Sequence, residues 1–402
     1  MRTVSRHEIR LLVLAVAVLV PVGFLGIRAA LTPETTDFRC FWTGAAFVLN
    51  GQDPYDVAEW TRATSGVTAD VFGQVRQSNC PGRYGYPLTT AIAMLPFGAL
   101  PLALAAAIWE FVLFAGAVAG AALLAHAARL SRSLGVALVV LVFASQPFEQ
   151  TLISGQFGGL SLLALGLLAA PKLGPIHSGG AVLLAALKPH AIPLVPLVRA
   201  RGERARTIAI AALPVTLVVL ASLAVQPTWP VSWIGELGGQ RREMFAASVS
   251  LWTLATAAGT PMLAPALVAM GLVPMAVAAR RARELHVLDV IAVVALGWLL
   301  VVPYGLTSDQ LAPLSAAWVA ILRRAVTPTV SLPLVIALLA VAGLLPWALY
   351  AVRYDVLPYR GLDLIGALVP LVTAAVLACA LARSPHVVTR MERSANPAVT
   401  SP

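Results

Sequence analysis

Long apolar stretches, separated by short polar segments, make up most of the chain. The first covers residues 11–31. The later ones cover residues 87–100, 101–128, 134–148, 156–171, 176–198, 207–226, 248–279, 287–303, 309–322, 329–350 and 362–382. Several of them approach the length of about 20 apolar residues that an α-helix needs to cross a bilayer. The pattern therefore predicts an all-α polytopic membrane protein with about 10–13 transmembrane or half-spanning helices.

Two features of this pattern leave the path of the chain open. Segment 248–279 is long enough for either one helix or two. Arg129 and Arg132 cannot face the same side of the membrane as the arginines of 199–206 if every segment between them crosses fully. Prolines interrupt these segments at several positions, so broken helices that line a cavity would account for the mismatch.

The first long polar segment, residues 32–86, contains one further helical pattern. Its apolar residues recur with the i, i+3, i+4, i+7 spacing of an amphipathic helix. They are Phe38, Phe41, Trp42, Ala45, Val48 and Leu49. Asn50-Gly51 is a typical helix end. At roughly 12 residues this helix is too short to span, so we expect a juxtamembrane helix that lies flat on the membrane surface, with Asp37 at its N-terminal end.

Composition narrows the class of protein. The 402 residues are 59% hydrophobic and only 11% charged, whereas ordinary globular chains carry roughly 25% charged residues. This balance excludes a soluble enzyme and a disordered protein. The net charge of +10 comes from short arginine clusters between apolar spans. That is the pattern that orients membrane proteins, and it does not indicate a nucleic-acid partner.

The arginines also orient the chain. Arg2, Arg6 and Arg10 precede the first apolar stretch and place the N-terminus in the cytoplasm. We therefore predict a single multi-pass domain over residues 1–402 in the plasma membrane. Its parts are a first transmembrane helix at 1–31, an extracytoplasmic catalytic loop at 32–86, a transmembrane bundle at 87–382 and a cytoplasmic tail at 383–402.

Acidic residues gather in the extracytoplasmic loop, which makes it the natural place for chemistry. A third of the 18 Asp and Glu residues lie there, at Glu34, Asp37, Asp53, Asp56, Glu59 and Asp70. Asp37 is either a helix N-cap or a carboxylate held at the membrane surface as a general base. The spacing alone favours neither interpretation. Asp53-Pro54-Tyr55 is by itself a turn.

Further polar clusters interrupt the apolar part of the chain. Arg83 and Tyr86 stand just before a span, where they form either part of a site or an interfacial aromatic belt. Glu149 and Gln156 flank a short loop between two spans and can be merely solvated there. Glu110 lies inside a span, so it is either a functional residue or a buried hydrogen-bonding partner.

Two later clusters complete the set of candidates. Lys188 and His190 lie within an apolar run, where a lysine costs about 2.5–3.5 kcal/mol and requires a partner. A bound phosphate and a buried carboxylate are both suitable partners, and the scarcity of lysine in this chain favours the phosphate. The last cluster runs from Tyr304 to Asp309, whose carboxylate either contacts a substrate or caps the next helix.

Cysteine and histidine usage bears on disulfides and cofactors. Cys40 and Cys80 lie in the same loop, whereas Cys379 lies in the last apolar span. A disulfide between the first two is plausible in an oxidising space, but the sequence leaves two free thiols equally open. The six His are scattered and no CxxC occurs. Because a phosphate-binding glycine loop is also missing, we predict neither a metal nor a nucleotide cofactor.

Taken in this order, the clusters resemble glycosyltransferase family 87. This is a branch of the membrane-embedded GT-C superfamily that includes polyprenol-phosphate-mannose-dependent α-mannosyltransferases. The resemblance covers Asp37 with Asn50 through Tyr55, Tyr84 through Leu88, Gly155-Gln156, Leu187 through Pro189, and Tyr304 through Asp309. The chain has Pro87-Leu88 where the family often has a double proline, and Val302-Pro303 where it often has Ser-Pro. These departures leave the sugar open.

The resemblance implies an inverting transfer of a hexose, with mannose the first expectation. The donor would be a polyprenyl-phosphate sugar and the acceptor a lipid, a glycolipid or a lipid-linked glycan, without a metal or nucleotide. Asp37 matches the family's first-loop Asp, the general base for the acceptor hydroxyl. Lys188 and Arg83 are the cations expected near the donor phosphate. The other expected substrate contacts are His190, Tyr86, Gln156, Tyr304 and Asp309.

Two other activities stay open. A transporter or flippase of lipid-linked sugars would need ionisable residues along several spans, whereas here they gather mostly in outer loops. An arabinofuranosyl or other pentose transferase, or a wall-polymer ligase of the same superfamily style, would differ only in its sugar or acceptor.

Overall fold

A computed structural model of the chain describes much of the loop and the bundle. The described residues are 37–65, 67–69, 75–77, 80, 83–170, 175–186, 205–236, 250–282, 285–302, 305, 307–325 and 363–382. The predicted first transmembrane helix, segment 329–350 and the predicted cytoplasmic tail lie outside the described residues.

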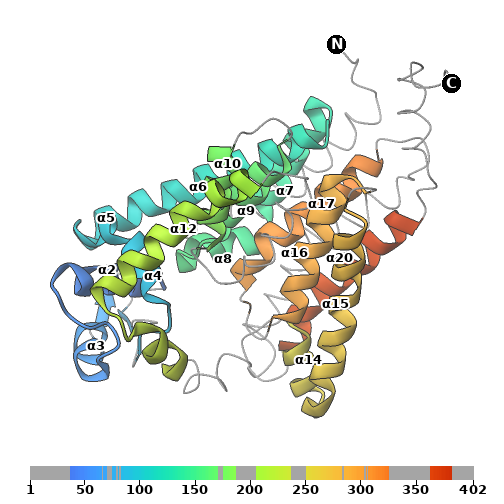
Figure 1. Cartoon of the computed structure of the whole chain (residues 1–402). Helices are drawn as coiled ribbons and strands as arrows, with labels where there is room; N and C mark the ends of the chain where they lie inside the picture. The colour runs from blue at the N-terminus through green and yellow to red at the C-terminus, as the bar shows by residue number, and fades with distance from the viewer. Residues whose placement is uncertain are drawn as a thin grey trace.

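Helices form nearly all of the regular structure in these residues, as the sequence predicts (Figure 1). The first half of the chain contains α2 (Asp37–Leu49), α3 (Val57–Thr64), α4 (Leu88–Ala93), α5 (Leu95–Gly98), α6 (Leu102–Ala127), α7 (Arg132–Ala144), α8 (Gln146–Ser154), α9 (Gly158–Ala169) and α10 (Pro175–Ala186). The second half contains α12 (Ala205–Val225), α14 (Leu251–Ala257), η3 (Pro261–Leu263), α15 (Ala264–Arg280), α16 (Val287–Val301), η4 (Thr307–Gln310), α17 (Leu311–Ala325) and α20 (Asp363–Ala382). The exception is an antiparallel hairpin of β1 (Val67–Ala69) and β2 (Val75–Gln77), which the all-α prediction did not include.

The long apolar helices support a membrane protein. Among the described residues, α6 and the segment Pro261–Arg280 are long and apolar enough to cross a bilayer. Two bent helix pairs raise this number from 2 to 4 if each pair forms one span. One pair is α7 with α8, bent by 53°, and the other is α12 with the helix Trp229–Glu236, bent by 94°. The predicted total of about 10–13 helices stays a prediction.

The described helices of the bundle form two groups, and α17 joins them. In the first group α6 packs on α7 and α9, and α10 packs on α9 and α12. The second group contains α14, α15, α16 and α20 (Figure 1). Helix α17 contacts α6, α7 and α9 on one side and α16 and α20 on the other, and its Trp318 is fully buried. The two groups therefore share one apolar core.

Glycines allow α6 and α9 to approach closely. Gly116 and Gly120 are spaced four residues apart on α6, the GxxxG pattern of tightly packed membrane helices. A Cβ added at Gly120 would lie 2.5 Å from the carbonyl carbon of Leu162. A Cβ added at Gly159 would overlap the carbonyl oxygen of Leu113. Because α9 begins just after residue 156, this backbone contact fixes the position of the preceding loop.

The path of the chain places Arg129, Arg132 and Arg206 at the same end of the bundle. The sequence alone could not assign them to one side of the membrane. Helix α6 begins next to α5, which packs on α2, and it ends just before Arg129. Leu223, near the end of α12, packs against buried aromatic residues of the loop between α2 and α4. Arg206, at the start of α12, therefore lies at the opposite end from that loop, as Arg129 and Arg132 do. Figure 1 shows that α6 runs away from α2 whereas α12 runs toward it, so the end of α6 and the start of α12 lie at the same end of the bundle.

Segment 248–279 forms two helices and not one. Helix α14 ends at Ala257, and Gly259 takes the left-handed conformation with φ +71°. Glycine adopts this conformation without strain, so the chain turns there before η3 and α15. Helix α15 runs antiparallel to α16, since Gly271 lies against Val301 and Gly297 against Met275.

Candidate active site

Helix α2 holds Asp37 at the edge of the protein core. Asp37 is the first residue of α2, where a negative charge interacts favourably with the helix dipole. The apolar residues Phe38, Phe41 and Ala45 of the same helix are fully buried in the core of the bundle. The prediction of a helix lying flat on the membrane missed this burial, because the amphipathic pattern cannot distinguish a lipid surface from a protein core. Packing therefore fixes the position from which the Asp37 carboxylate projects.

Two other side chains that the sequence singles out, those of Gln156 and Tyr86, form a hydrogen-bonded chain with this carboxylate. The Nε2 of Gln156 donates a hydrogen bond to Oδ2 of Asp37 at 2.5 Å, across 119 residues of sequence. The same nitrogen lies 3.1 Å from the hydroxyl oxygen of Tyr86 and donates to it. The amide of Gln156 thus links the carboxylate of Asp37 on α2 to the hydroxyl of Tyr86, which lies just before α4.

A left-handed glycine places Gln156 in this position. Gly155 ends α8 with φ +64°, a conformation that favours glycine. A Cβ there would lie 2.5 Å from the Cβ of Phe38, so a side chain would collide with α2. The indole Nε1 of Trp109 donates to the carbonyl of Gly155 at 2.7 Å. The turn is therefore held by α2 on one side and by α6 on the other.

Aromatic rings support the three polar groups. The ring of Phe41 lies 4.6 Å from that of Tyr86, in an edge-on arrangement, and 4.9 Å from that of Phe157. Phe157 in turn packs edge-on against Trp109 at 5.3 Å. Such contacts restrict ring orientation. Aromatic residues close to Asp37 and Gln156 in the sequence therefore fix the positions of the backbone segments that carry these two side chains.

The last predicted cluster lies against α8. Thr151 of α8 donates to the carbonyl of Ser308 at 3.4 Å, and η4 packs along the helix. Ser308 is buried, whereas Asp309 is partly exposed. The structure thus places the element that carries Asp309 next to the helix that ends at the Gly155 turn. Lys188, His190 and Tyr304, three further predicted site residues, lie outside the described residues.

The family model for glycosyltransferase family 87 matches residues 84–303 of the chain. The chain belongs to this family. Tyr86 and Gln156 lie within the matched residues, whereas Asp37 and Arg83 precede them. No curated protein and no solved structure matches the chain.

In this family 87 protein a disulfide joins α2 to the loop that precedes α4. Cys40 and Cys80 are bonded, with their Cα atoms 5.5 Å apart. The indole of Trp60 donates to the carbonyl of Cys80 at 3.1 Å. Asp56 caps α3 by accepting from the backbone of the first turn, and Asp53 accepts from the backbone N–H of Tyr55. These two acids of the loop therefore stabilise local structure. Asp53 stabilises the turn that the sequence predicts at Asp53-Pro54-Tyr55.

Two buried tyrosines complete the loop side of the site. The hydroxyl of Tyr55 donates to the carbonyl of Tyr86 at 2.8 Å. Burial raises the pKa of Tyr55 and of Tyr84 well above the ordinary value, so both stay protonated at neutral pH. A Cβ added at Gly44 would lie only 2.7 Å from a ring carbon of Tyr84. A glycine in α2 is thus required for the approach of this ring.

Arg83 has a partner that the sequence reasoning missed. Its Nη1 lies 3.0 Å and 3.2 Å from the two carboxylate oxygens of Glu236, and 47% of its side chain is exposed. Glu236 ends the helix Trp229–Glu236, whose Trp233 donates to the carbonyl of Gly85 at 3.2 Å. In the sequence, the position of Glu236 after Trp229 and Trp233, at the end of an apolar segment, could have indicated this partner. This helix holds the segment that leads to Tyr86.

Of the two candidate acids inside the bundle, Glu149 is buried and Glu110 is partly buried. Glu149 of α8 accepts a hydrogen bond from Nε2 of Gln150. Glu110 lies beside Trp109 on α6 and is partly buried. No group of three or more His, Cys, Asp or Glu side chains suited to a metal ion occurs within the part of the chain that the structure describes.

Proposed function

We propose that this membrane glycosyltransferase transfers a hexose, with mannose the first choice, from a polyprenyl-phosphate donor. The acceptor is a lipid, a glycolipid or a lipid-linked glycan in cell-envelope biosynthesis. Membership of family 87 and the long apolar helices support the class of reaction and the lipid environment. The hydrogen bond between Gln156 and Asp37 carries the site assignment, because it joins two separate predicted motifs at one carboxylate.

The proposed reaction inverts the anomeric centre in a single displacement. The Asp37 carboxylate takes the proton of the acceptor hydroxyl, and the acceptor oxygen forms a bond to the anomeric carbon. The bond from that carbon to the donor phosphate breaks on the opposite side. The phosphate leaves with the electron pair as an anion, so no acid is needed on the leaving side. Gln156 orients the carboxylate through its hydrogen bond to Oδ2.

Recognition of the donor phosphate is assigned to cations near this carboxylate. Arg83 lies three residues before Tyr86 and is half exposed, so its guanidinium is accessible to a phosphate. Lys188 and His190 are proposed to act with it, and Tyr304 and Asp309 to contact the substrate. A planar guanidinium matches the geometry of phosphate oxygens.

The proposed site faces the extracytoplasmic side of the plasma membrane. The bundle end opposite α2 carries the arginines that end or follow several helices, namely Arg129, Arg132, Arg280, Arg281, Arg323 and Arg324. Arginines concentrate on the cytoplasmic side of membrane proteins. The chain is then one multi-pass domain with its catalytic loop at 32–86 outside and residues 383–402 inside.

Transfer assays with purified protein test this proposal. We would offer synthetic polyprenyl-phosphate mannose, glucose and arabinofuranose, with Asp37→Asn as the inactive control and product analysis for anomeric configuration. The proposal predicts transfer of a hexose with inversion. Transfer of the pentose alone would replace the hexose assignment.

A cell-based measurement complements the assay. Mass spectrometry of envelope glycolipids from a deletion strain should show a precursor that lacks one hexose. Proteoliposomes that move lipid-linked sugar across the bilayer without any sugar transfer would overturn the proposal in favour of a flippase.

A further inference from the structure

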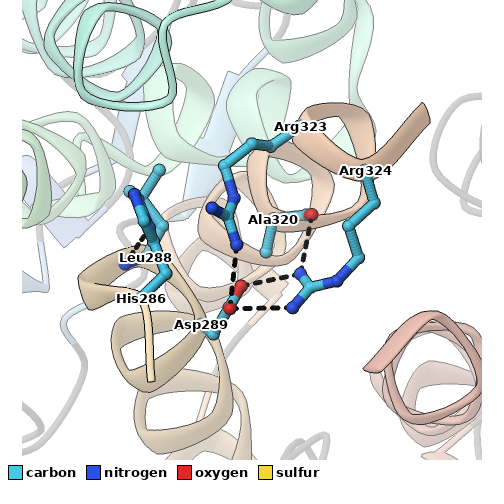
Figure 2. Close-up of polar contacts among 6 residues, drawn as sticks. All are labelled: His286, Leu288, Asp289, Ala320, Arg323 and Arg324. Carbon is cyan, nitrogen blue, oxygen red and sulfur yellow. Dashed lines mark hydrogen bonds and ion pairs between the residues drawn. The ribbon is translucent and has the colours of Figure 1, made fainter. Parts of the chain in front are cut away.

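The end of the bundle opposite Asp37 contains a carboxylate bound by two arginines (Figure 2). Asp289 lies in the first turn of α16 and is only 3% exposed. Both Nη nitrogens of Arg324 donate to it at 2.7 Å, one to each oxygen. Arg323 adds a third hydrogen bond through Nη2, at 2.9 Å. The cluster joins the start of α16 to the end of α17.

This cluster has an excess of positive charge. Two guanidinium groups share one carboxylate, so the pair of helices retains one net positive charge near the protein interior. His286, which caps α16, experiences the resulting field. Burial and the neighbouring Arg323 lower the pKa of His286 to about 4, and Arg324 and Arg129 act in the same direction while Asp289 opposes them. The histidine is therefore neutral at pH 7 and does not add to the charge. A third arginine, Arg129, lies between α6 and α7, and both of these helices pack on α17.

Arg323 also has hydrogen-bonding capacity that Asp289 does not use. Only its Nη2 bonds to the carboxylate, whereas Arg324 makes two parallel bonds. Within the described part of the chain, Nε of Arg323 is buried and makes no hydrogen bond. A buried donor without an acceptor is costly. An anion beside Arg323 would lower this cost and balance the charge.

Arg129 gives the cluster an accessible side. It follows the end of α6, is exposed, and has φ 52°, which turns the chain sharply before α7. The cluster therefore lies at the end of membrane helices, at the depth where lipid headgroups are found. Basic pockets between helix ends are the usual protein partners of anionic headgroups.

We propose that Arg129 and Arg323 form a binding site for a phosphate group, and that the phosphate belongs to an anionic lipid headgroup. The site is separate from the Asp37 region and does not depend on the proposed sugar transfer. Arg324 and Asp289 hold the frame of the site, and Arg129 and Arg323 supply the donors. Phosphate is favoured over a simple halide because guanidinium groups bind its oxygens in pairs.

Lipid-dependent thermal stability tests this site. The full-length protein in a neutral detergent would be titrated separately with phosphatidylglycerol, phosphatidylcholine and inorganic phosphate, and its melting temperature followed by tryptophan fluorescence. The variants are Arg129→Gln and Arg323→Gln. Arg62→Gln, which removes an exposed arginine from α3 at the other end of the molecule, is the charge-matched control. The half-saturating lipid concentration is the readout, so a lower starting stability of a variant does not obscure the result.

Phosphatidylglycerol should raise the melting temperature, and phosphatidylcholine should not. Half-saturation should shift upward about tenfold in Arg129→Gln and in Arg323→Gln, since each loses a charged donor, and should be unchanged in Arg62→Gln. Stabilisation by inorganic phosphate alone, with the same dependence on the two arginines, would assign the site to free phosphate. Equal effects of both lipids, or equal half-saturation in all three variants, would overturn the proposal.

Discussion

Two aspartates lie in the first turns of helices at opposite ends of the bundle, and their hydrogen-bond partners differ. Asp37 opens α2 and accepts a hydrogen bond from the neutral amide of Gln156. Asp289 lies in the first turn of α16 and accepts three hydrogen bonds from two guanidinium groups. Each carboxylate interacts favourably with its helix dipole, so the local sequence role is similar. The partners that come from distant segments distinguish them.

The two charged partners of Asp289 suit a structural role, whereas the neutral partner of Asp37 suits the proposed catalytic role. Charged donors bind both oxygens of Asp289 and hold α16 to α17. The neutral amide of Gln156 binds Oδ2 of Asp37 and orients its carboxylate, which suits the proposed role of general base. An acid in the first turn of a helix is therefore not informative alone. Its partners decide what it does.

The Asp289 end should depend on its carboxylate for stability. Asp289→Ala leaves two arginines in a mostly buried position without their counter-charge, and the free energy of unfolding should fall by about 3–5 kcal/mol. Denaturation in mixed micelles measures this change. Asp56→Ala, which removes an exposed helix cap, is the comparison and should cost about 1 kcal/mol. A loss at Asp289 no larger than that at Asp56 would mean that the ion cluster does not stabilise the bundle.

The contact of α6 with α9 connects the two ends and should be sensitive to one methyl group. Gly120→Ala places a carbon 2.5 Å from the backbone of Leu162, and we expect a loss of about 1–3 kcal/mol in the same denaturation assay. Gly180→Ala in α10 is the matched control, because nothing lies within 4 Å of its added Cβ. That variant should be neutral or slightly more stable. Equal behaviour of the two variants would refute the close packing.

The rate of sugar transfer should depend on the hydrogen bond between Gln156 and Asp37. Gln156→Leu removes the donor to the carboxylate, and kcat should fall roughly 10- to 100-fold, the value of a hydrogen bond to a charged group. The KM values of both substrates should change little, because Gln156 acts through Asp37. Steady-state transfer kinetics separate the two constants, and Gln226→Leu, just after the end of α12, is the control. A change in KM alone would make Gln156 a substrate contact and not a positioning residue.

The ion pair at the mouth of the site should have the smallest effect. If Arg83 binds the donor phosphate as proposed, Glu236 competes with that phosphate, and Glu236→Gln should lower the KM for the donor. An exposed pair contributes up to about 1 kcal/mol, which limits the change to roughly fivefold. Glu59→Gln, an exposed acid of α3, should leave that KM unchanged. A higher donor KM in Glu236→Gln would show that the carboxylate holds Arg83 in place and does not compete with the phosphate.

The sequence predicted the helices and the order of the site motifs, but not their partners. Apolar periodicity is local, so α6, α12 and α16 were found close to their true bounds. Gly155-Gln156 was found as a motif, yet its contact with Asp37 depends on the fold of 119 intervening residues. Asp289 was not singled out, because Arg323 and Arg324 looked like orientation signals and their carboxylate lies in another helix. The burial of α2 was also missed, since a lipid surface and a protein core favour the same residues.

The comparison of the two aspartates is tested most directly by replacing each with Asn and measuring both properties of each variant. Asp37→Asn should lower the single-turnover rate of sugar transfer by about 10²- to 10⁴-fold and change the free energy of unfolding by no more than about 1 kcal/mol. Asp289→Asn should show the reverse, with a large loss of stability and a nearly normal rate per folded molecule. A wild-type transfer rate in folded Asp37→Asn would contradict the assignment of Asp37 as the general base.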